Sequence, residues 1–349
     1  MKQILKQVLG VDVAQKELVV TLRKMYDDLT LDLYAYKVFK NNKTGFATLL
    51  KWLKPIIDKD IKLQFVMEAT GVYHQKFAYY LDEKGCNLTI VLPNKISNYM
   101  RTLEVRTITD KTASQAICQF GLERKLECWI KPKKVYKELQ QLTRERSQIV
   151  DERVIVKNQL HAENTEAEPN KSSLKRLKAR IKFLNQQEKE IKVEIQDIVN
   201  KDAELKKELE NICTIPGVGI LTAVIVIAET NGFELIRNKK QVTSYAGLDV
   251  KEKQAGTSIR SKPRISKKGN RNLRKAMHLP SLSAVKYNKN HKELYVRLIA
   301  KSGIKMKGLI AVQRKLLELI YVVYKNKKGF IQNYEQQKRA TPLEMETAL

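Results

Sequence analysis

A heptad repeat of apolar residues in the middle of the chain restricts the fold more than any other feature. The repeat runs from residue 135 to residue 212 on a strongly charged background. Its first half places apolar residues seven apart, with others between them, at Val135, Leu139, Leu142, Ile149, Val156 and Leu160. Its second half alternates apolar residues three and four apart and is interrupted only by the polar Glu188 and Asp202. Such a pattern is typical of long helices that pack along one apolar seam.

The segment 162–173 divides this repeat into two predicted helices. It contains Pro169 and Asn170, which favour a turn. We therefore expect an antiparallel coiled-coil hairpin that serves as a spacer or an oligomerisation arm. Two helices of an ordinary bundle are the alternative.

The amino-terminal part alternates strands and helices. Residues 4–13, 17–22 and 30–39 have the apolar patterns of three successive strands. The elements predicted after them are a helix at 44–53, a strand at 63–67, a helix at 73–84, a strand at 88–92 and a helix at 111–120. The resulting order, β-β-β-α-β-α-β-α, is that of a ribonuclease-H-like α/β fold, in which acids from two strands and a late helix meet at one metal site.

Three carboxylates fall at the positions that this fold uses. Asp12 interrupts an apolar strand, Glu68 closes another, and Asp110 opens the last predicted helix. A carboxylate in such a strand costs several kcal/mol unless it is paired, solvated or bound to a cation. Each acid alone fits a helix cap or a strand-end charge, but together they predict a Mg²⁺ site against a phosphate.

The charge of the chain points to nucleic acid as the partner. Its 66 Lys and Arg residues outnumber 38 Asp and Glu residues, for a net charge of +28. A surplus of this size, spread over the whole length, favours binding to a polyanion. No signal-type segment or run long enough to span a bilayer is present. We expect a cytoplasmic protein, nucleoid-associated when bound to DNA and without a membrane partner.

Two segments in the carboxy-terminal part have features of phosphate binding. Gly217 and Gly219 precede an apolar helix and resemble a helix-hairpin-helix turn, in which backbone amides approach a phosphate. A plain helix start is the alternative. The second segment holds eight basic residues and no acid: Arg260, Lys262, Arg264, Lys267, Lys268, Arg271, Arg274 and Lys275. We interpret it as a nucleic-acid contact, with a solvated surface as the alternative.

Several short motifs, in this order, resemble one transposase family. They are Gly10-Val11-Asp12-Val13, Val66-Met67-Glu68-Ala69-Thr70-Gly71, Thr109-Asp110-Lys111, Ile215-Pro216-Gly217-Val218-Gly219 and Ser244-Tyr245-Ala246-Gly247-Leu248. The chain resembles the transposases of bridge-RNA-guided insertion sequences, which have a RuvC-like DEDD domain. The resemblance implies a RuvC-like domain at 1–130, a coiled coil at 131–212, a mainly helical transposase domain at 213–327 and a tail at 328–349.

The resemblance also implies a mechanism. The family uses four acids with Mg²⁺ and a serine that attacks DNA to form a covalent phosphoserine. It joins donor and target DNA, which a bridge RNA selects, in a dimer of dimers. Here the fourth acid position is Ala113 and the serine position is Ala255. We expect a chain inactivated by deliberate change or natural decay; the alternatives are a metal-dependent junction resolvase and a non-catalytic nucleic-acid scaffold.

Overall fold

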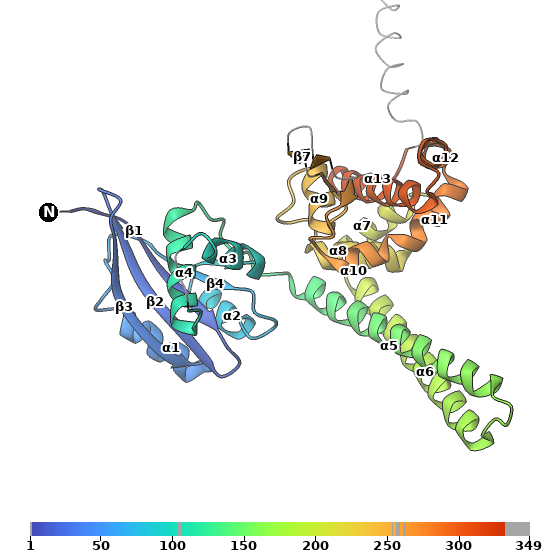
Figure 1. The fold of residues 1–349 in the computed structure, drawn as a ribbon, viewed down its shortest axis with the longest axis horizontal. Coiled ribbons are helices and arrows are strands. Elements are labelled where there is room, and N and C mark those ends of the chain that lie inside the picture. Colours follow the sequence, from blue (N-terminus) through green and yellow to red (C-terminus); the bar gives the residue numbers. More distant parts are fainter. Residues whose placement is uncertain (1, 104–106, 253, 256–258, 261–262, 332–349) are drawn as a thin grey trace, which may run out of the picture. The chain divides into compact units, whose positions relative to one another are not determined.

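The chain folds into two compact units, Met1–Lys131 and Pro132–Leu349 (Figure 1). The computed structural model describes residues 2–103, 107–252, 254–255, 259–260 and 263–331, with 33–34, 254–255 and 259–260 described by their backbone alone. In these ranges no helix has the length and apolar character needed to cross a bilayer. Each unit is described separately below.

The amino-terminal unit is built on a mixed five-stranded sheet of order β3-β2-β1-β4-β5. Its strands are β1 (Ile4–Val13), β2 (Glu17–Tyr26), β3 (Leu31–Lys40), β4 (Leu63–Glu68) and β5 (Asn87–Val91). The first three strands pair antiparallel, and β4 and β5 run parallel to β1. The strands follow the predicted order, although β2 continues four residues beyond its predicted end.

Helices cover both faces of this sheet. They are α1 (Lys43–Leu53), α2 (Gln75–Glu83), α3 (Pro93–Met100) and α4 (Asp110–Glu123). Alternate residues of β1 serve the two faces, as the pleat of a strand requires. Leu9 and Val11 share one apolar cluster with α1 and α2, whereas Val8 shares another with α3 and α4. The helix α3 was not predicted; Pro93, at its first position, is the signal for its start.

Close contact holds α4 against the sheet. A Cβ added to Gly10 would lie 2.4 Å from Cys118 N and Ser114 O, so only glycine lets the helix backbone come so near. The buried hydroxyls of Ser114 and Thr21 lie 2.8 Å apart in a hydrogen bond, which ties the helix to β2. Lys6 Nζ donates to carbonyls at the carboxyl end of the helix, where a cation is favourable. These contacts fix where Asp110, its first residue, lies.

The second unit begins with two long helices, α5 (Lys134–Thr165) and α6 (Lys171–Lys201), which lie side by side and run in opposite directions (Figure 1). The residues between them, 166–170, are fewer than predicted because the Asn170 side chain accepts from the amides of Ser172 and Ser173 and starts α6 early. The buried residues of the predicted repeat include Leu139, Leu142, Ile149 and Val156 in α5 and Leu184 in α6. The antiparallel reversal is therefore present, and its coiled-coil packing stays a prediction.

The two polar interruptions of the repeat have different structural roles. Asp202 ends the long helix, because its side chain accepts from Leu205 N at 3.0 Å and starts α7 (Ala203–Cys213). The second helix is therefore not continuous to Ile212 as the repeat predicted. Glu188 stays inside α6 and is 5% exposed. It forms ion pairs with Arg146 and Arg153 of α5 and with Lys192.

The remaining helices pack with α7 and the first turns of α5 around one apolar cluster. They are α8 (Ile220–Thr230), α9 (Lys239–Ala246), α10 (Arg271–Ala276), α11 (His278–Tyr287), α12 (Lys289–Ser302) and α13 (Lys305–Asn326). Two short antiparallel pairs join α9 to α10: β6 (Val250–Lys251) with β9 (Arg264–Ile265), and β7 (Gln254–Ala255) with β8 (Ile259–Arg260). Most of the tail predicted at 328–349 lies outside the described residues.

Candidate functional site

Asp12 lies near each of the other two predicted acids at one end of the amino-terminal sheet. Asp12 and Glu68 lie on adjacent parallel strands, where Val11 pairs with Met67 and the two acids follow directly. Burial raises the pKa of Asp12, and the negative charge of Asp110 raises it further, although a backbone hydrogen bond from Val13 opposes both. Burial also raises the pKa of Glu68, with a second contribution from Asp12. Asp12 is therefore within electrostatic reach of both other carboxylates.

The carboxylate oxygens of these acids are ligands suited to a hard cation, but they do not form a complete coordination site. No salt bridge neutralises any of the three in the described part of the amino-terminal unit. Equally, among the described residues no three Asp, Glu, His or Cys side chains are arranged to hold a metal. Mg²⁺ commonly binds one or two carboxylates and completes its shell with water and substrate phosphates. Asp12 and Glu68, which are partly buried, and the exposed Asp110 fit that open kind of site.

We expect the change Asp12→Asn to stabilise the protein when no divalent cation is present. A carboxylate whose pKa is raised by folding favours the folded state only at low pH, and this contribution is lost as pH rises through the folded pKa. At neutral pH the charged Asp12 therefore opposes folding, and the amide removes that cost. The unfolding temperature should rise by roughly 2–4 °C. Tryptophan fluorescence measures it, because Trp52 and Trp129 both lie in this unit.

With Mg²⁺ added, the parent protein should have a higher unfolding temperature than Asp12→Asn, the reverse of the order without Mg²⁺. A cation that binds only the folded state raises the unfolding temperature of the parent protein and leaves Asp12→Asn unchanged. The exposed Asp60 gives a matched control, Asp60→Asn, which should respond to Mg²⁺ as the parent does. An equal response to Mg²⁺ in Asp12→Asn would show that the cation binds elsewhere.

Ala113 lies on α4 one turn after Asp110, on the same face of the helix. Its amide donates to Thr109 O at 2.8 Å, inside an amino-terminal turn that Thr109 and Thr112 cap reciprocally. The backbone here is ordinary helix, a conformation that aspartate also adopts. Its methyl group offers no ligand, and a carboxylate there would stand beside that of Asp110.

The basic segment predicted to bind nucleic acid is spread over several elements. Arg264 is exposed in β9, Lys267 and Lys268 are exposed in the following loop, and Arg271 and Arg274 lie on α10. Arg260 is described only as the end of β8, and Lys262 lies outside the described residues. The candidate serine position, Ala255, ends β7 and pairs with Ile259. Residues 256–258, which include Ser258, lie outside the described residues.

The two predicted phosphate-binding glycines face different surroundings. Gly217 has a φ of +94°, and a Cβ there would lie 2.7 Å from Ala284 N of α11. The positive φ and the close approach of α11 therefore explain why position 217 is a glycine. Gly219 is exposed at the N-cap of α8 with nothing within 4 Å of an added Cβ. Only Gly219 leaves room for an approaching phosphate.

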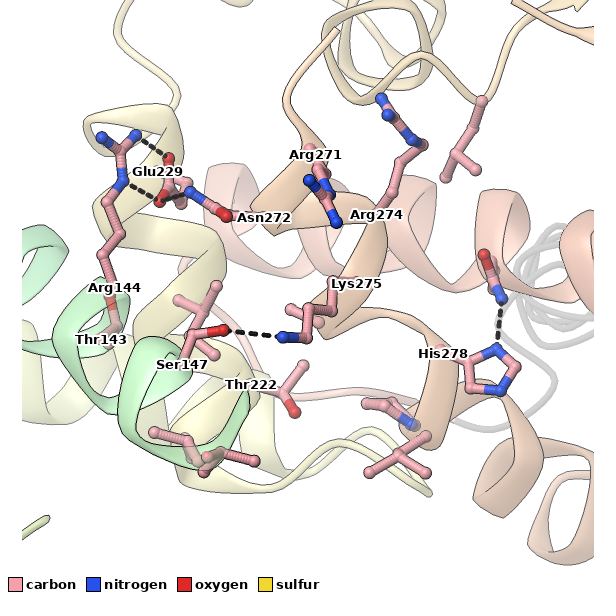
Figure 2. Close-up of a pocket in the computed structure, with 18 of the residues that line it drawn as sticks. Thr143, Arg144, Ser147, Thr222, Glu229, Arg271, Asn272, Arg274, Lys275 and His278 are labelled. Carbon is pink, nitrogen blue, oxygen red and sulfur yellow. Dashed lines mark hydrogen bonds and ion pairs between the residues drawn. The ribbon is translucent and has the colours of Figure 1, made fainter. Parts of the chain in front are cut away.

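A cleft in the second unit gathers basic residues from helices that are distant in the sequence (Figure 2). It has a volume of about 690 Å³. Arg271, Arg274 and Lys275 come from α10, whereas Arg144 and Arg146 come from α5. We did not predict the two α5 arginines as site residues, because in the sequence they are ordinary charged positions of a heptad helix.

The one acid lining this cleft, Glu229 of α8, holds its walls together. It is 2% exposed and accepts from Arg144 Nε at 2.7 Å and from a terminal nitrogen of Arg144 at 2.8 Å. The amides of Asn270 and Asn272 donate to the same carboxylate at 2.7 and 3.1 Å. Burial alone would raise the pKa of Glu229, but these hydrogen bonds lower it below its usual value. The acid therefore stays charged and fixes α10 relative to α5 and α8.

Comparison with known proteins identifies the family. A transposase family model of the DEDD, IS110 type matches residues 9–166, and a second model, described as transposase IS116/IS110/IS902 family, matches residues 209–296. The chain belongs to the IS110 family of transposases. The two matched regions cover the acid site of this IS110 transposase and most of the residues that line the cleft around Glu229.

Relatives of this IS110 transposase include proteins named for inverting a gene. The pilin gene-inverting protein of Moraxella lacunata is 27% identical over 331 residues, 93% of this chain and 98% of that protein. Its counterpart in Moraxella bovis is 27% identical over 84% of this chain and 89% of that protein. A solved structure, T. thermophilus RuvC in complex with a Holliday junction substrate, is similar at 12% identity and a TM-score of 0.27, over 36% of this chain and 99% of that one. The family assignment rests on the sequence matches.

Proposed function

We propose that this transposase type joins donor and target DNA through a covalent phosphoserine, with Mg²⁺ at the acid site and a bridge RNA selecting the sequences, and that this copy is inactive. The observation that supports the proposal is that Asp12 interacts electrostatically with both Glu68 and Asp110, at the carboxyl ends of β1 and β4, in a chain of the IS110 family. The relatives named for pilin gene inversion also support it, because inverting a segment breaks and rejoins DNA.

The acids have a defined role in this proposal. Asp12, with Glu68 or Asp110, would hold a Mg²⁺ ion, which stabilises the charge that develops on a phosphate as its bonds change. The raised pKa of Asp12 and of Glu68 means that these carboxyl groups bind protons more readily than usual. Cation binding must therefore displace protons and weaken as the pH falls.

The serine step accounts for strand exchange without an external energy source. In an active relative the serine oxygen forms a bond to phosphorus while the bond to the leaving strand breaks, and the serine proton ends on the leaving oxygen. The reverse step, on a new strand, restores the phosphodiester. Ala255 has no hydroxyl to start this reaction, and Ala113 removes one carboxylate from α4. We therefore expect DNA binding without cleavage.

Restoring both positions tests the proposal. The double change Ala113→Asp and Ala255→Ser, supplied with Mg²⁺, RNA and DNA, should produce protein covalently attached to a DNA end, where the parent chain gives none. Denaturing gels of labelled DNA detect the adduct. Each single change is the matched control and should give far less. Free cleaved ends without an adduct would favour the junction resolvase, and unchanged DNA would favour the non-catalytic scaffold.

Ser258 provides a second check on the serine position. It lies three residues after Ala255 in the sequence. If Ser258→Ala abolishes adducts while Ala255→Ser adds nothing, the nucleophile has been assigned to the wrong residue. If Ser258→Ala leaves the adducts of the restored protein intact, the assignment to position 255 stands.

The RNA and the assembly state are further parts of the proposal. The resemblance implies that the noncoding DNA flanking the gene encodes the bridge RNA, which co-purification and sequencing of bound RNA would identify. It also implies a dimer or tetramer in which the acid site of one subunit meets the serine position of another. Light scattering of the full chain measures this, and a monomer with and without nucleic acid would contradict it.

A further inference from the structure

We propose that the cleft between α5, α8 and α10 binds an unpaired nucleotide of a nucleic-acid strand, with the phosphate on its basic rim and the base on its aliphatic floor. The inference rests on the proposed function in one respect, that the chain handles nucleic acid. It adds a specific site and a specific state of the strand. Figure 2 labels Arg144, Arg271, Arg274 and Lys275 among the basic residues that line the cleft.

The rim has positive charge that the protein does not neutralise. Arg144 is paired with Glu229, and Lys275 is paired with Asp151 at 2.7 Å. Among the described residues, Arg274 donates only to backbone carbonyls, at 2.8 and 3.1 Å, and these leave its charge uncompensated. Arg271 is exposed and forms no ion pair with another described residue. Two guanidinium groups one helical turn apart on α10 are therefore available for a phosphate.

The floor has a different chemistry from the rim. Aliphatic side chains from several elements form most of it, namely Leu221, Ile225, Leu248, Ile265, Leu279 and Ile310. A phosphate alone gains nothing from such a surface, whereas the face of a base does. Leu279 is 72% exposed, so this part of the apolar surface is open to solvent in the free chain. Thr222, His278 and Gln313 add hydrogen-bonding groups at the same surface.

The size and lining of the cleft select an unpaired base. Its volume, about 690 Å³, falls in the range of pockets that enclose small organic ligands. A base inside a duplex is stacked and paired, so it can enter such a pocket only from a single strand or after extrusion. No Phe, Tyr or Trp is among the described residues that line the cleft. A base seated there is consequently removed from aromatic stacking.

The experiment uses the full chain with three probes: a 12-nucleotide thymidine DNA strand, the equivalent uridine RNA strand and a 12-base-pair DNA duplex. Each strand carries a central 2-aminopurine, whose fluorescence rises when stacking is lost. Thr222→Phe fills the cleft, and Arg271→Gln removes rim charge. Arg176→Gln is the matched control, because Arg176 is exposed on α6 and does not line the cleft. Fluorescence anisotropy gives the affinities.

We expect the parent chain to raise 2-aminopurine fluorescence on binding. Thr222→Phe should weaken single-strand binding about 10-fold, because its ring takes the space that the base would occupy, and change duplex binding less than about 2-fold. Arg271→Gln should weaken single-strand binding roughly 5-fold. It should also reduce the slope of log K against log salt concentration by about 1, as the loss of one phosphate contact does. Arg176→Gln should stay within about 2-fold. A stronger preference for the RNA strand assigns the site to RNA, and equal or stronger DNA binding assigns it to DNA.

Some results would overturn the inference. Unchanged single-strand affinity in both Thr222→Phe and Arg271→Gln, or unchanged 2-aminopurine fluorescence on binding, would show that the cleft holds no base. Circular dichroism checks folding; should Thr222→Phe unfold, Leu279→Ala replaces it, at an exposed side chain, with an expected loss of about 3-fold. If the restored enzyme forms no adducts but the cleft variants still weaken single-strand binding, the serine mechanism is rejected and the nucleotide site stands. Adducts with cleft-independent binding would reject this site alone.

Discussion

The change Gly10→Ala is expected to destabilise the amino-terminal unit by about 3 kcal/mol. The added methyl group would lie 2.4 Å from Cys118 N and from Ser114 O, and both are backbone atoms of α4. Backbone cannot move aside as a side chain does, so the whole helix must shift outward. The lower chain entropy of alanine in the unfolded state offsets only about 0.4–1 kcal/mol of this. Because Asp110 opens α4, the same shift separates it from Asp12.

Denaturant unfolding followed by tryptophan fluorescence measures this effect, since both tryptophans lie in the affected unit. The matched control is Gly121→Ala, on the same helix. The three atoms nearest its Cβ all belong to the side chains of Val8 and Val66, with methyl groups at 2.7 and 2.9 Å, and none of them is a backbone atom. We expect that change to cost less than half as much. Unaltered unfolding of Gly10→Ala would mean that α4 does not depend on this close approach.

The second large effect is expected for Glu188→Gln, at about 3–5 kcal/mol of lost stability in the second unit. Glu188 is 5% exposed and pairs with three cations, of which Arg146 and Arg153 have side chains only 22% and 20% exposed. The neutral amide leaves these charges clustered without a counter-ion. Ellipticity at 222 nm measures the loss, because this unit is mainly helical. Glu194→Gln, at an exposed position of the same helix, should change stability by less than about 0.5 kcal/mol.

The difference in stability between the parent and Glu188→Gln should depend on pH, because of the pKa of Glu188. Burial would raise it, but hydrogen bonds from Lys192, Arg153 and Arg146 lower it from 4.5 to about 2. A lowered folded pKa gives stability that is fully present above the unfolded pKa and is lost as pH falls through the folded one. The gap between the parent and Glu188→Gln should therefore be constant above about pH 5 and shrink toward pH 2. A gap that widens in acid would contradict the ion-pair explanation.

The amino-terminal fold could be predicted because its signals are local. Apolar alternation gave the five strands in order, and Pro93, a start signal that was overlooked, explains the missing helix α3. Asp12, Glu68 and Asp110 could be named for the same reason, since the order of elements fixes which strand ends are neighbours. The boundaries were less exact, because caps such as that of Asn170 extend a helix beyond its apolar pattern.

The basic cleft could not be predicted in the same way. Arg144 and Arg271 are 127 positions apart in the sequence, and nothing in the pattern near Arg144 distinguishes it from other heptad charges. Glu229 lies in the last turn of the apolar helix α8 and resembles any helix-end acid, yet it is buried and binds Arg144, Asn270 and Asn272. Glu188 interrupts the repeat for a comparable reason. The burial of both acids is explained by partners that are distant in the sequence and come near only when the helices pack.

The sequence by itself determined the order of strands and helices, the long reversed helix pair, the three acids and the positive charge, because periodicity and composition act over neighbouring residues. The tertiary structure alone decided that Gly10 admits the backbone of α4, that Glu229 joins three segments, and that α5 and α10 form one cleft. These features depend on distances between residues that are remote in the chain, and such distances are set when side chains pack against one another.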